Sequence, residues 1–134
     1  MDPAATIVVR PVTRLGVSQL AVLLRRADGE ETEILRRPGM DTPTVTAEIE
    51  RRLTASPEAG PGLLIDLEEC DWVDSGVLGV WVAWYHAVND QGGRVVICRP
   101  NERIRNILRI SQLDQLFATH ATLEDAVADL TSAG

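Results

Sequence analysis

The sequence predicts a single α/β domain in which helices pack on a sheet. Strand-like and helical segments alternate over residues 63–130, and a strand–helix–strand order at this spacing implies a right-handed crossover between adjacent parallel strands. The chain has 134 residues, the usual size of one domain, and 45% of them are apolar, enough to form a core. Neither an internal repeat nor a low-complexity tract is present.

The first third of the chain predicts a hairpin. Residues 6–9 have the composition of a short strand, but the pattern gives it no position in the fold. Residues 18–39 contain two β-compatible runs on either side of Asp28-Gly29, a strong turn signal. The second run is rich in Arg and Glu, so we expect it near a sheet edge or with one face in water.

A helix follows the hairpin. Pro38 and Gly39 end the second run, and Asp41 or Thr42 is suited to cap a helix with Pro43 in its first turn. Apolar residues recur every four positions up to an end near Ala55, at Val45, Ile49 and Leu53. Residues 56–62, Ser-Pro-Glu-Ala-Gly-Pro-Gly, predict a loop.

The second half predicts two buried strands with a helix between them. Residues 63–70 open with a continuous apolar run, Leu63-Leu64-Ile65, which suits a strand covered on both faces. Residues 94–100 are rich in β-branched residues and predict a second buried strand. The helix over 75–90 ends at Gly92-Gly93. Asn101 is suited to cap the next helix, and residues 113–117 form a short apolar connector. Thr122 and Asp125 have capping-box spacing before a last helix. The apolar faces of these two helices carry Ile104, Ile107, Leu108 and Ser111, and Leu123, Ala126, Val127 and Leu130.

Charge and composition exclude several classes of function. The formal net charge of −7 argues against nucleic acid or an anionic membrane surface as the main partner. No run of 18 apolar residues exists, so we expect no membrane insertion. The first ten residues lack the pattern of a signal peptide, which predicts a cytoplasmic protein.

The chemistry-bearing residues predict neither an enzyme nor a cofactor. No nucleophile–base pair, phosphate-binding glycine loop or metal-ligand spacing is present, and His86 and His120 are isolated. Cys70 and Cys98 belong to strand-like runs, and we expect both to be buried, reduced thiols.

The junction before the helix at 75–90 is the strongest candidate site. Asp74 and Ser75 lie where a helix start leaves backbone N–H groups without partners, so either side chain can cap it. A phosphate on Ser75 would also be stabilised there by the N–H groups and the helix dipole. The hydroxyl can therefore serve as a cap, a switch, or both. The acidic residues beside it favour a solvated rim or a kinase-docking surface over a cation site: Asp66, Glu68, Glu69, Asp71 and Asp74.

The helix over 75–90 is apolar nearly all round. One stripe can cover the sheet: Val77, Leu78, Trp81, Trp84, Tyr85 and Val88. Four small or branched apolar residues lie off the centre of that stripe: Val80, Val82, Ala83 and Ala87. Such a helix is covered on more than one side. The second cover is either the domain's own core or a partner, and the sequence leaves both open.

Residues 62–130 resemble the anti-sigma factor antagonist family, the STAS domains. The resemblance is carried by a strand with an Asp, an aromatic residue before Asp74-Ser75, Leu78-Gly79-Val80, Gly92-Gly93-Arg94 and the segment Ile-Leu-Arg-Ile-Ser-Gln-Leu-Asp-Gln-Leu-Phe. Residues 20–55 fit the family's hairpin and first helix more loosely. We therefore expect a STAS domain at 20–134 and an N-terminal extension at 1–19.

The resemblance implies a four- to five-stranded mixed sheet with helices mainly on one side, and no catalysis. It implies that an anti-sigma factor that is also a serine kinase binds the domain and phosphorylates it, and that a serine phosphatase reverses the modification. The implied phosphorylation site is Ser75. The implied partner-binding residues are Asp74, Ser75, Gly76, Val77 and Leu78.

The chain departs from the family at this site. The common pattern is Asp-Ser-Ser/Thr-Gly with phosphate on the hydroxyl before Gly, whereas here Gly76 and Val77 occupy those last two positions. Stressosome-type members carry phosphate directly after the Asp, which matches Ser75. The alternatives are a switched antagonist, a constitutive scaffold in a stressosome-like or lipid-transport assembly, and a lost switch. Self-association is compatible with each.

Overall fold

The computed structural model describes residues 6–14, 17–26, 28–39, 42–55 and 62–131. Six strands, four α-helices and one 3-10 turn follow one another in these residues. Their bounds are β1 Thr6–Arg14, β2 Val17–Arg25, β3 Glu31–Pro38, α1 Thr42–Ala55, β4 Gly62–Asp66, α2 Ser75–Asp90, β5 Arg94–Cys98, α3 Glu102–Ile110, η1 Leu113–Gln115, β6 Ala118–His120 and α4 Leu123–Thr131.

One mixed sheet contains all six strands, in the order β3-β2-β1-β4-β5-β6. The β1–β2 and β2–β3 pairs are antiparallel, and the other three pairs are parallel. Leu63 aligns with Val95 and Ile65 with Ile97, which confirms the expected parallel neighbours. The sheet has one strand more than the upper bound expected.

β1 lies inside the sheet between β2 and β4, in the segment that the sequence left without a position. The expected boundary at residue 20 falls within β2. Arg10 and Pro11 interrupt the apolar run, so the sequence pattern of β1 is weak. A proline also lacks the N–H that a strand with neighbours on both sides needs for hydrogen bonding. Pro11 is tolerated because β1 pairs with β4 only over residues 7–9. At position 11, β1 therefore has a neighbouring strand, β2, on one side only.

The hairpin of β2 and β3 forms as expected. Gly29 adopts a φ of 92°, which favours glycine, and the Asp28 carboxylate accepts a hydrogen bond from the Glu30 N–H at 2.9 Å. β3 is an edge strand, as its charges predicted. The register shifts by one residue between Val22 and Leu23, so Ile34 has no opposite residue and forms a bulge.

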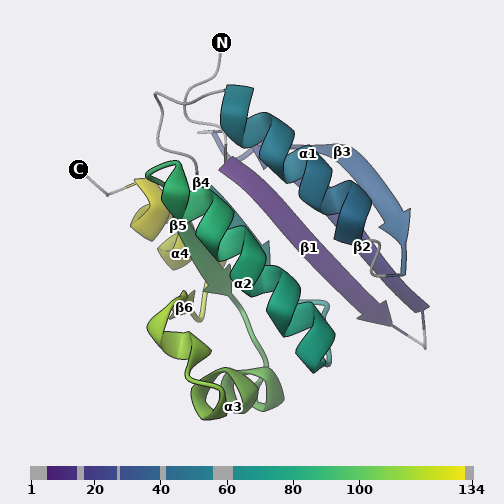
Figure 1. Cartoon of the computed structure of the whole chain (residues 1–134), viewed down its shortest axis with the longest axis vertical. Helices are drawn as coiled ribbons and strands as arrows, with labels where there is room; N and C mark the ends of the chain where they lie inside the picture. The colour runs from purple at the N-terminus through teal and green to yellow at the C-terminus, as the bar shows by residue number, and fades with distance from the viewer. Residues whose placement is uncertain (1–5, 15–16, 27, 40–41, 56–61, 132–134) are drawn as a thin grey trace.

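Helices cover both faces of the sheet, three on one and one on the other. Figure 1 shows α1 and α2 side by side in front of the sheet and α4 behind it. The larger core lies under α1, α2 and α3, and the smaller core lies between the sheet and α4, around Leu64, Val96 and Ala126. The expectation of helices mainly on one side is confirmed.

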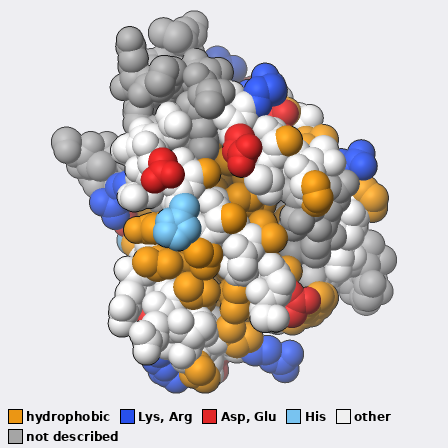
Figure 2. Space-filling view, in the orientation of Figure 1, with side chains coloured by type: hydrophobic (Ala, Val, Ile, Leu, Met, Phe, Trp, Pro, Cys, Tyr) orange, Lys and Arg blue, Asp and Glu red, His pale blue; other side chains and the backbone are white. Residues whose placement is uncertain are grey.

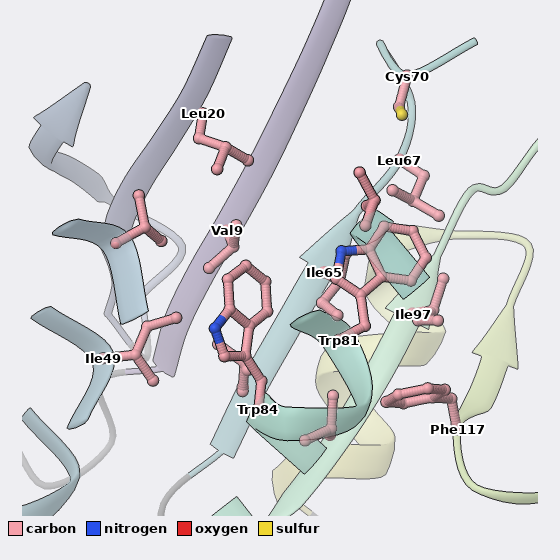
Figure 3. Close-up of a cluster of buried hydrophobic side chains, with 14 of the residues drawn as sticks. Val9, Leu20, Ile49, Ile65, Leu67, Cys70, Trp81, Trp84, Ile97 and Phe117 are labelled. Carbon is pink, nitrogen blue, oxygen red and sulfur yellow. The ribbon is translucent and has the colours of Figure 1, made fainter. Parts of the chain in front are cut away.

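Two tryptophans of α2 fill the centre of the larger core. Trp81 and Trp84 are each 1% exposed, and Figure 3 shows the Trp84 ring beside Val9 and the Trp81 ring next to Ile65 and Ile97. Trp84 Nε1 donates a hydrogen bond to Thr46 Oγ1 of α1 at 3.0 Å, so its polar atom is satisfied. This packing fixes the orientation of α2 and therefore of its first turn.

Element ends differ from the expected ones in two places. β4 ends at Asp66 rather than at residue 70, because the Asp66 carboxylate accepts from the Glu68 N–H and turns the chain. The connector over 113–117 contains η1, and Phe117 is buried before β6, a three-residue strand that periodicity did not predict. The loop expected at 56–62 lies outside the described residues up to position 61.

Candidate functional site

The candidate site is the junction loop, Leu67–Asp74, together with the first turn of α2. Two side chains from other elements hold the loop at Asp71. Thr13 Oγ1 accepts from the Asp71 N–H at 2.7 Å, and Asn101 Nδ2 donates to the Asp71 carbonyl at 3.0 Å. Because Asn101 Oδ1 also caps α3 by accepting from the Ile104 N–H at 2.8 Å, the loop and α3 share one anchor.

Asp74 is the N-cap of α2, and Ser75 is not. Asp74 Oδ1 accepts from the Val77 N–H at 2.9 Å, while its backbone is extended at φ −117°. Ser75 is the first helical residue, and it is exposed. No described residue forms a hydrogen bond with its hydroxyl. The helix cap is therefore Asp74, and the Ser75 hydroxyl is open to solvent.

The other three residues implied as partner-binding differ in their surroundings. Gly76 is exposed, and a Cβ at this position would lie 3.4 Å from the Asp74 carboxylate. Val77 is 7% exposed and belongs to the larger core. Leu78 is partly buried against that core. The structure thus brings Asp74, Ser75 and Gly76 together at the surface and places Val77 beneath them.

Trp72 is an exposed aromatic side chain in the same loop. It is 42% exposed, whereas Val73 directly after it and Cys70 two residues before it are buried. Its carbonyl accepts a hydrogen bond from the Cys70 thiol at 3.2 Å, so the backbone that presents the ring is held. An aromatic side chain presented by an ordered loop is characteristic of interface anchors. The sequence showed the aromatic before Asp74, but not that it faces solvent.

Asp66 does not belong to the acidic surface cluster expected from the sequence. Its carboxylate is 0% exposed and accepts hydrogen bonds from Arg10 Nε at 2.8 Å and from Arg99 Nη2 at 2.7 Å. Arg10 also forms an ion pair with Glu31, and Arg99 forms one with Glu68. Two arginines far apart in the sequence therefore neutralise the charge, a pairing that residue spacing alone does not reveal.

The ion-pair network lies in a polar hollow of about 510 Å³, whose lining includes Arg10, Arg25, Glu31, Asp66, Glu68 and Arg99. Burial alone would raise the pKa of Asp66, but hydrogen bonds from Arg99 and Arg10 hold it below its usual value. Arg99 has a left-handed backbone at φ 59°, and its N–H donates to the His120 carbonyl at 2.8 Å. Each of the three arginines in this hollow pairs with at least one carboxylate.

Both cysteines are free and buried, as expected. Burial raises the pKa of Cys70, and burial together with the nearby Asp66 charge raises the pKa of Cys98 to about 12. The thiolate form is disfavoured at both positions, so the two side chains behave as small core residues.

The outer side of α2 is only partly covered. Leu78, Val82 and Tyr85 are partly exposed, and Ile110 at the end of α3 is 78% exposed. Figure 2 shows hydrophobic side chains in a broken band along α2 and towards α3. The core therefore covers one stripe of α2, and a second apolar surface adjoins the junction loop.

In the described part of the chain, the His, Cys, Asp and Glu side chains form no group that could hold a metal ion. His120 instead pairs with Asp129 at 2.8 Å. Among the described helices, none has the length and apolar character needed to cross a membrane.

Curated relatives match about half of the chain. A protein from Thermotoga neapolitana, named as an anti-sigma factor antagonist, is 31% identical over 68 residues. A protein of the same description from Thermotoga maritima is 25% identical over 68 residues. Each match covers 51% of this chain and 60% of the relative, so the chain spans about three-fifths of these relatives' length.

Solved structures extend the similarity of fold across most of the chain. The T. maritima anti-sigma factor antagonist structure has a TM-score of 0.52 at 19% identity, covering 65% of this chain and 76% of that one. A STAS-domain protein from Planctomyces limnophilus has a TM-score of 0.53 at 14% identity, covering 92% and 97%. The sequence profile of the STAS domain matches residues 39–126, which include α1, the junction loop and α2. With its sheet, its helices and this match in agreement, the chain belongs to the STAS domain family.

Proposed function

We propose that this chain is a non-catalytic interaction module that acts as an anti-sigma factor antagonist and is switched by phosphorylation of Ser75. The observation that carries the proposal is the division of roles at the start of α2. Asp74 supplies the helix cap, so the exposed Ser75 hydroxyl is left without a structural task. The names of the curated relatives support the antagonist role.

A phosphate at this position would find both attraction and repulsion. The Ser75 and Gly76 N–H groups at the helix start, with the positive end of the helix dipole, would stabilise it. Asp74 is directly adjacent and would repel a dianion. The modified state would therefore strain the cap that Asp74 forms with Val77, and would place up to two new charges on the docking surface.

The partner surface is expected to be basic or neutral. Glu68, Asp71 and Asp74 are exposed around the loop, and they disfavour an acidic or nucleic-acid surface. The implied partners are an anti-sigma factor that is also the serine kinase, and a serine phosphatase, acting in the cytoplasm. Docking would involve Asp74, Ser75, Gly76 and Leu78, with Val77 supporting them from the core and Trp72 as an added contact.

Affinity for the anti-sigma factor of the same organism tests this proposal. Ser75→Ala should bind within about twofold of wild type, since it removes no contact within the described chain. Ser75→Asp should bind at least about tenfold more weakly, because a charge would be desolvated on docking. A change in intrinsic fluorescence on binding would report on the exposed Trp72, since Trp81 and Trp84 already lie in the core and should change little. Binding of Ser75→Asp at the wild-type affinity would refute the switch.

A constitutive scaffold subunit is the second candidate function. It is favoured by Gly76 and Val77, which replace the hydroxyl and glycine that usually end the family's phosphorylation pattern. In that case Ser75→Asp and Ser75→Ala would bind a partner equally, and the loop would serve as a fixed contact.

A further inference from the structure

One edge of the sheet has no neighbouring strand within the described residues. β3 ends the strand order and pairs with β2 alone among the described strands. Figure 1 shows it as the outermost strand, with no element drawn beyond it. An edge strand presents a row of backbone N–H and C=O groups that can pair with another strand.

The bulge at Ile34 determines which side chains of β3 share a face. Directly opposite residues of two antiparallel strands point to the same face of a sheet. Glu33 lies opposite Leu23, and Arg36 lies opposite Ala21, and both of these β2 residues belong to the smaller core. Glu33 and Arg36 therefore share that face, although an unbulged strand would place residues three apart on opposite faces.

The order of charges along β3 makes the strand complementary to itself. Read from residue 31 to residue 37, the sequence is Glu-Thr-Glu-Ile-Leu-Arg-Arg. In an antiparallel pair of two copies centred between Ile34 and Leu35, Glu33 faces Arg36 of the second copy, and Thr32 faces Arg37. The bulge makes this register possible, because each of these pairs then lies on one face.

We propose that β3 is a homodimerisation edge, at which two copies of this chain pair antiparallel to form one continuous sheet. Glu33 and Arg36 already form an ion pair at 2.6 Å within one copy, and both are about half exposed. The two-fold axis would bring two such pairs together as four charges of alternating sign.

Edge strands also use charges, bulges and proline to resist pairing. The feature of β3 that favours pairing is the order of its charges, since two acidic residues precede two basic ones and a second antiparallel copy meets opposite signs. A two-strand edge buries less than a standard interface of about 1,600 Å². We therefore expect a weak dimer, with a dissociation constant of about 1 µM to 1 mM. In the strand order, β2 and β1 lie between β3 and β4, so the paired strands of the proposed dimer do not include the strand that leads into α2.

Sedimentation equilibrium of the whole chain, with charge-reversed variants, tests this proposal. Glu33→Arg alone and Arg36→Glu alone should each place like charges opposite one another and weaken self-association by about tenfold or more. An equimolar mixture of the two variants should associate as wild type does, because each copy then meets the opposite charge. The intrachain pair stays broken in both variants, so recovery in the mixture reports the contact between copies.

A matched control is Arg51→Glu, which breaks an exposed ion pair of the same spacing with Glu48 on α1. This variant should dimerise as wild type does, and circular dichroism should show that all variants remain folded. A wild-type chain that is monomeric up to about 1 mM would overturn the proposal. Dimerisation of both single variants at the wild-type affinity, or no recovery in the mixture, would equally overturn it. These outcomes are independent of the role of Ser75.

Discussion

Asp66 and Arg99 form a two-point ion pair at the adjacent carboxyl ends of β4 and β5. Arg99 Nη2 lies 2.7 Å from Asp66 Oδ2, and Arg99 Nε lies 3.2 Å from Asp66 Oδ1. Arg10 binds the same carboxylate from β1. These contacts join three neighbouring strands directly before the junction loop. The ion pair therefore holds the point at which the chain leaves β4 and enters the loop.

Asp66→Asn should lower the free energy of unfolding at pH 7 by about 3 kcal/mol, because it removes the shared partner of two arginines from a buried position. Chemical denaturation monitored by circular dichroism measures this loss. Glu33→Gln, which removes an exposed carboxylate paired with Arg36, serves as the control and should cost under about 1 kcal/mol. Equal losses in the two variants would contradict the structural role of Asp66.

The same ion pair predicts a dependence on pH. The folded pKa of Asp66 is lowered, so its stabilisation is complete above the unfolded value of about 3.9. It is lost as the pH falls from there through the folded pKa. The difference in unfolding free energy between wild type and Asp66→Asn should therefore narrow below about pH 4. The pKa of Glu31 is also lowered, so the unfolding free energy of Asp66→Asn should still fall with falling pH, but less steeply than that of wild type. A constant difference from pH 7 to pH 2 would contradict the lowered pKa.

Asn101 predicts that α3 and the junction loop can be uncoupled. Asn101→Ala removes the cap of α3 and the tie to Asp71, and should cost about 1–2 kcal/mol. Asn101→Asp keeps an acceptor for the Ile104 N–H but loses the donor to the Asp71 carbonyl. It should retain most of the stability while hydrogen exchange of the loop amides increases. Equal destabilisation by both variants would show that the tie, rather than the cap, supplies the stability.

Val77 and Leu78 should respond differently to the same substitution. Val77→Asp buries an unpaired charge in the core and should cost about 3–5 kcal/mol. Leu78→Asp affects a partly exposed side chain and should cost about 1 kcal/mol while weakening partner binding. Thermal unfolding and binding, measured on both variants, separate the two effects. A larger loss of stability for Leu78→Asp would place it in the core instead.

The two thiols should be unreactive in the native protein. Both are buried with raised pKa values, so a thiol reagent at pH 8 should label neither at a rate above that of unfolding. After denaturation without reductant, the reagent should find two thiols. Rapid labelling of the folded protein, or fewer than two thiols after denaturation, would contradict this description.

The helices and the parallel strands followed from local patterns in the sequence. Asn101 and Thr122 cap their helices as predicted, since capping depends on residues within three positions. β1 was not placed, because Arg10 and Pro11 hide a strand whose position depends on β2 and β4. β6 is three residues long, too short for periodicity to reveal.

The candidate site was predictable in location but not in detail. The sequence placed Asp74 and Ser75 at a helix start, but either could have been the cap until the geometry assigned that role to Asp74. Asp66 was grouped with the surface acids because its partners, Arg10 and Arg99, lie 56 and 33 residues away along the chain. Contacts over such separations depend on the tertiary fold, which spacing does not encode.

Localisation of phosphate by mass spectrometry tests directly whether Ser75 is the phosphorylation site. The wild-type chain and Ser75→Ala are each incubated with ATP and the serine kinase of the same partner-switching system. We expect one phosphate on the wild-type chain, located on Ser75 at the first turn of α2, and none on Ser75→Ala. Phosphate on another residue, or equal incorporation into Ser75→Ala, would contradict it.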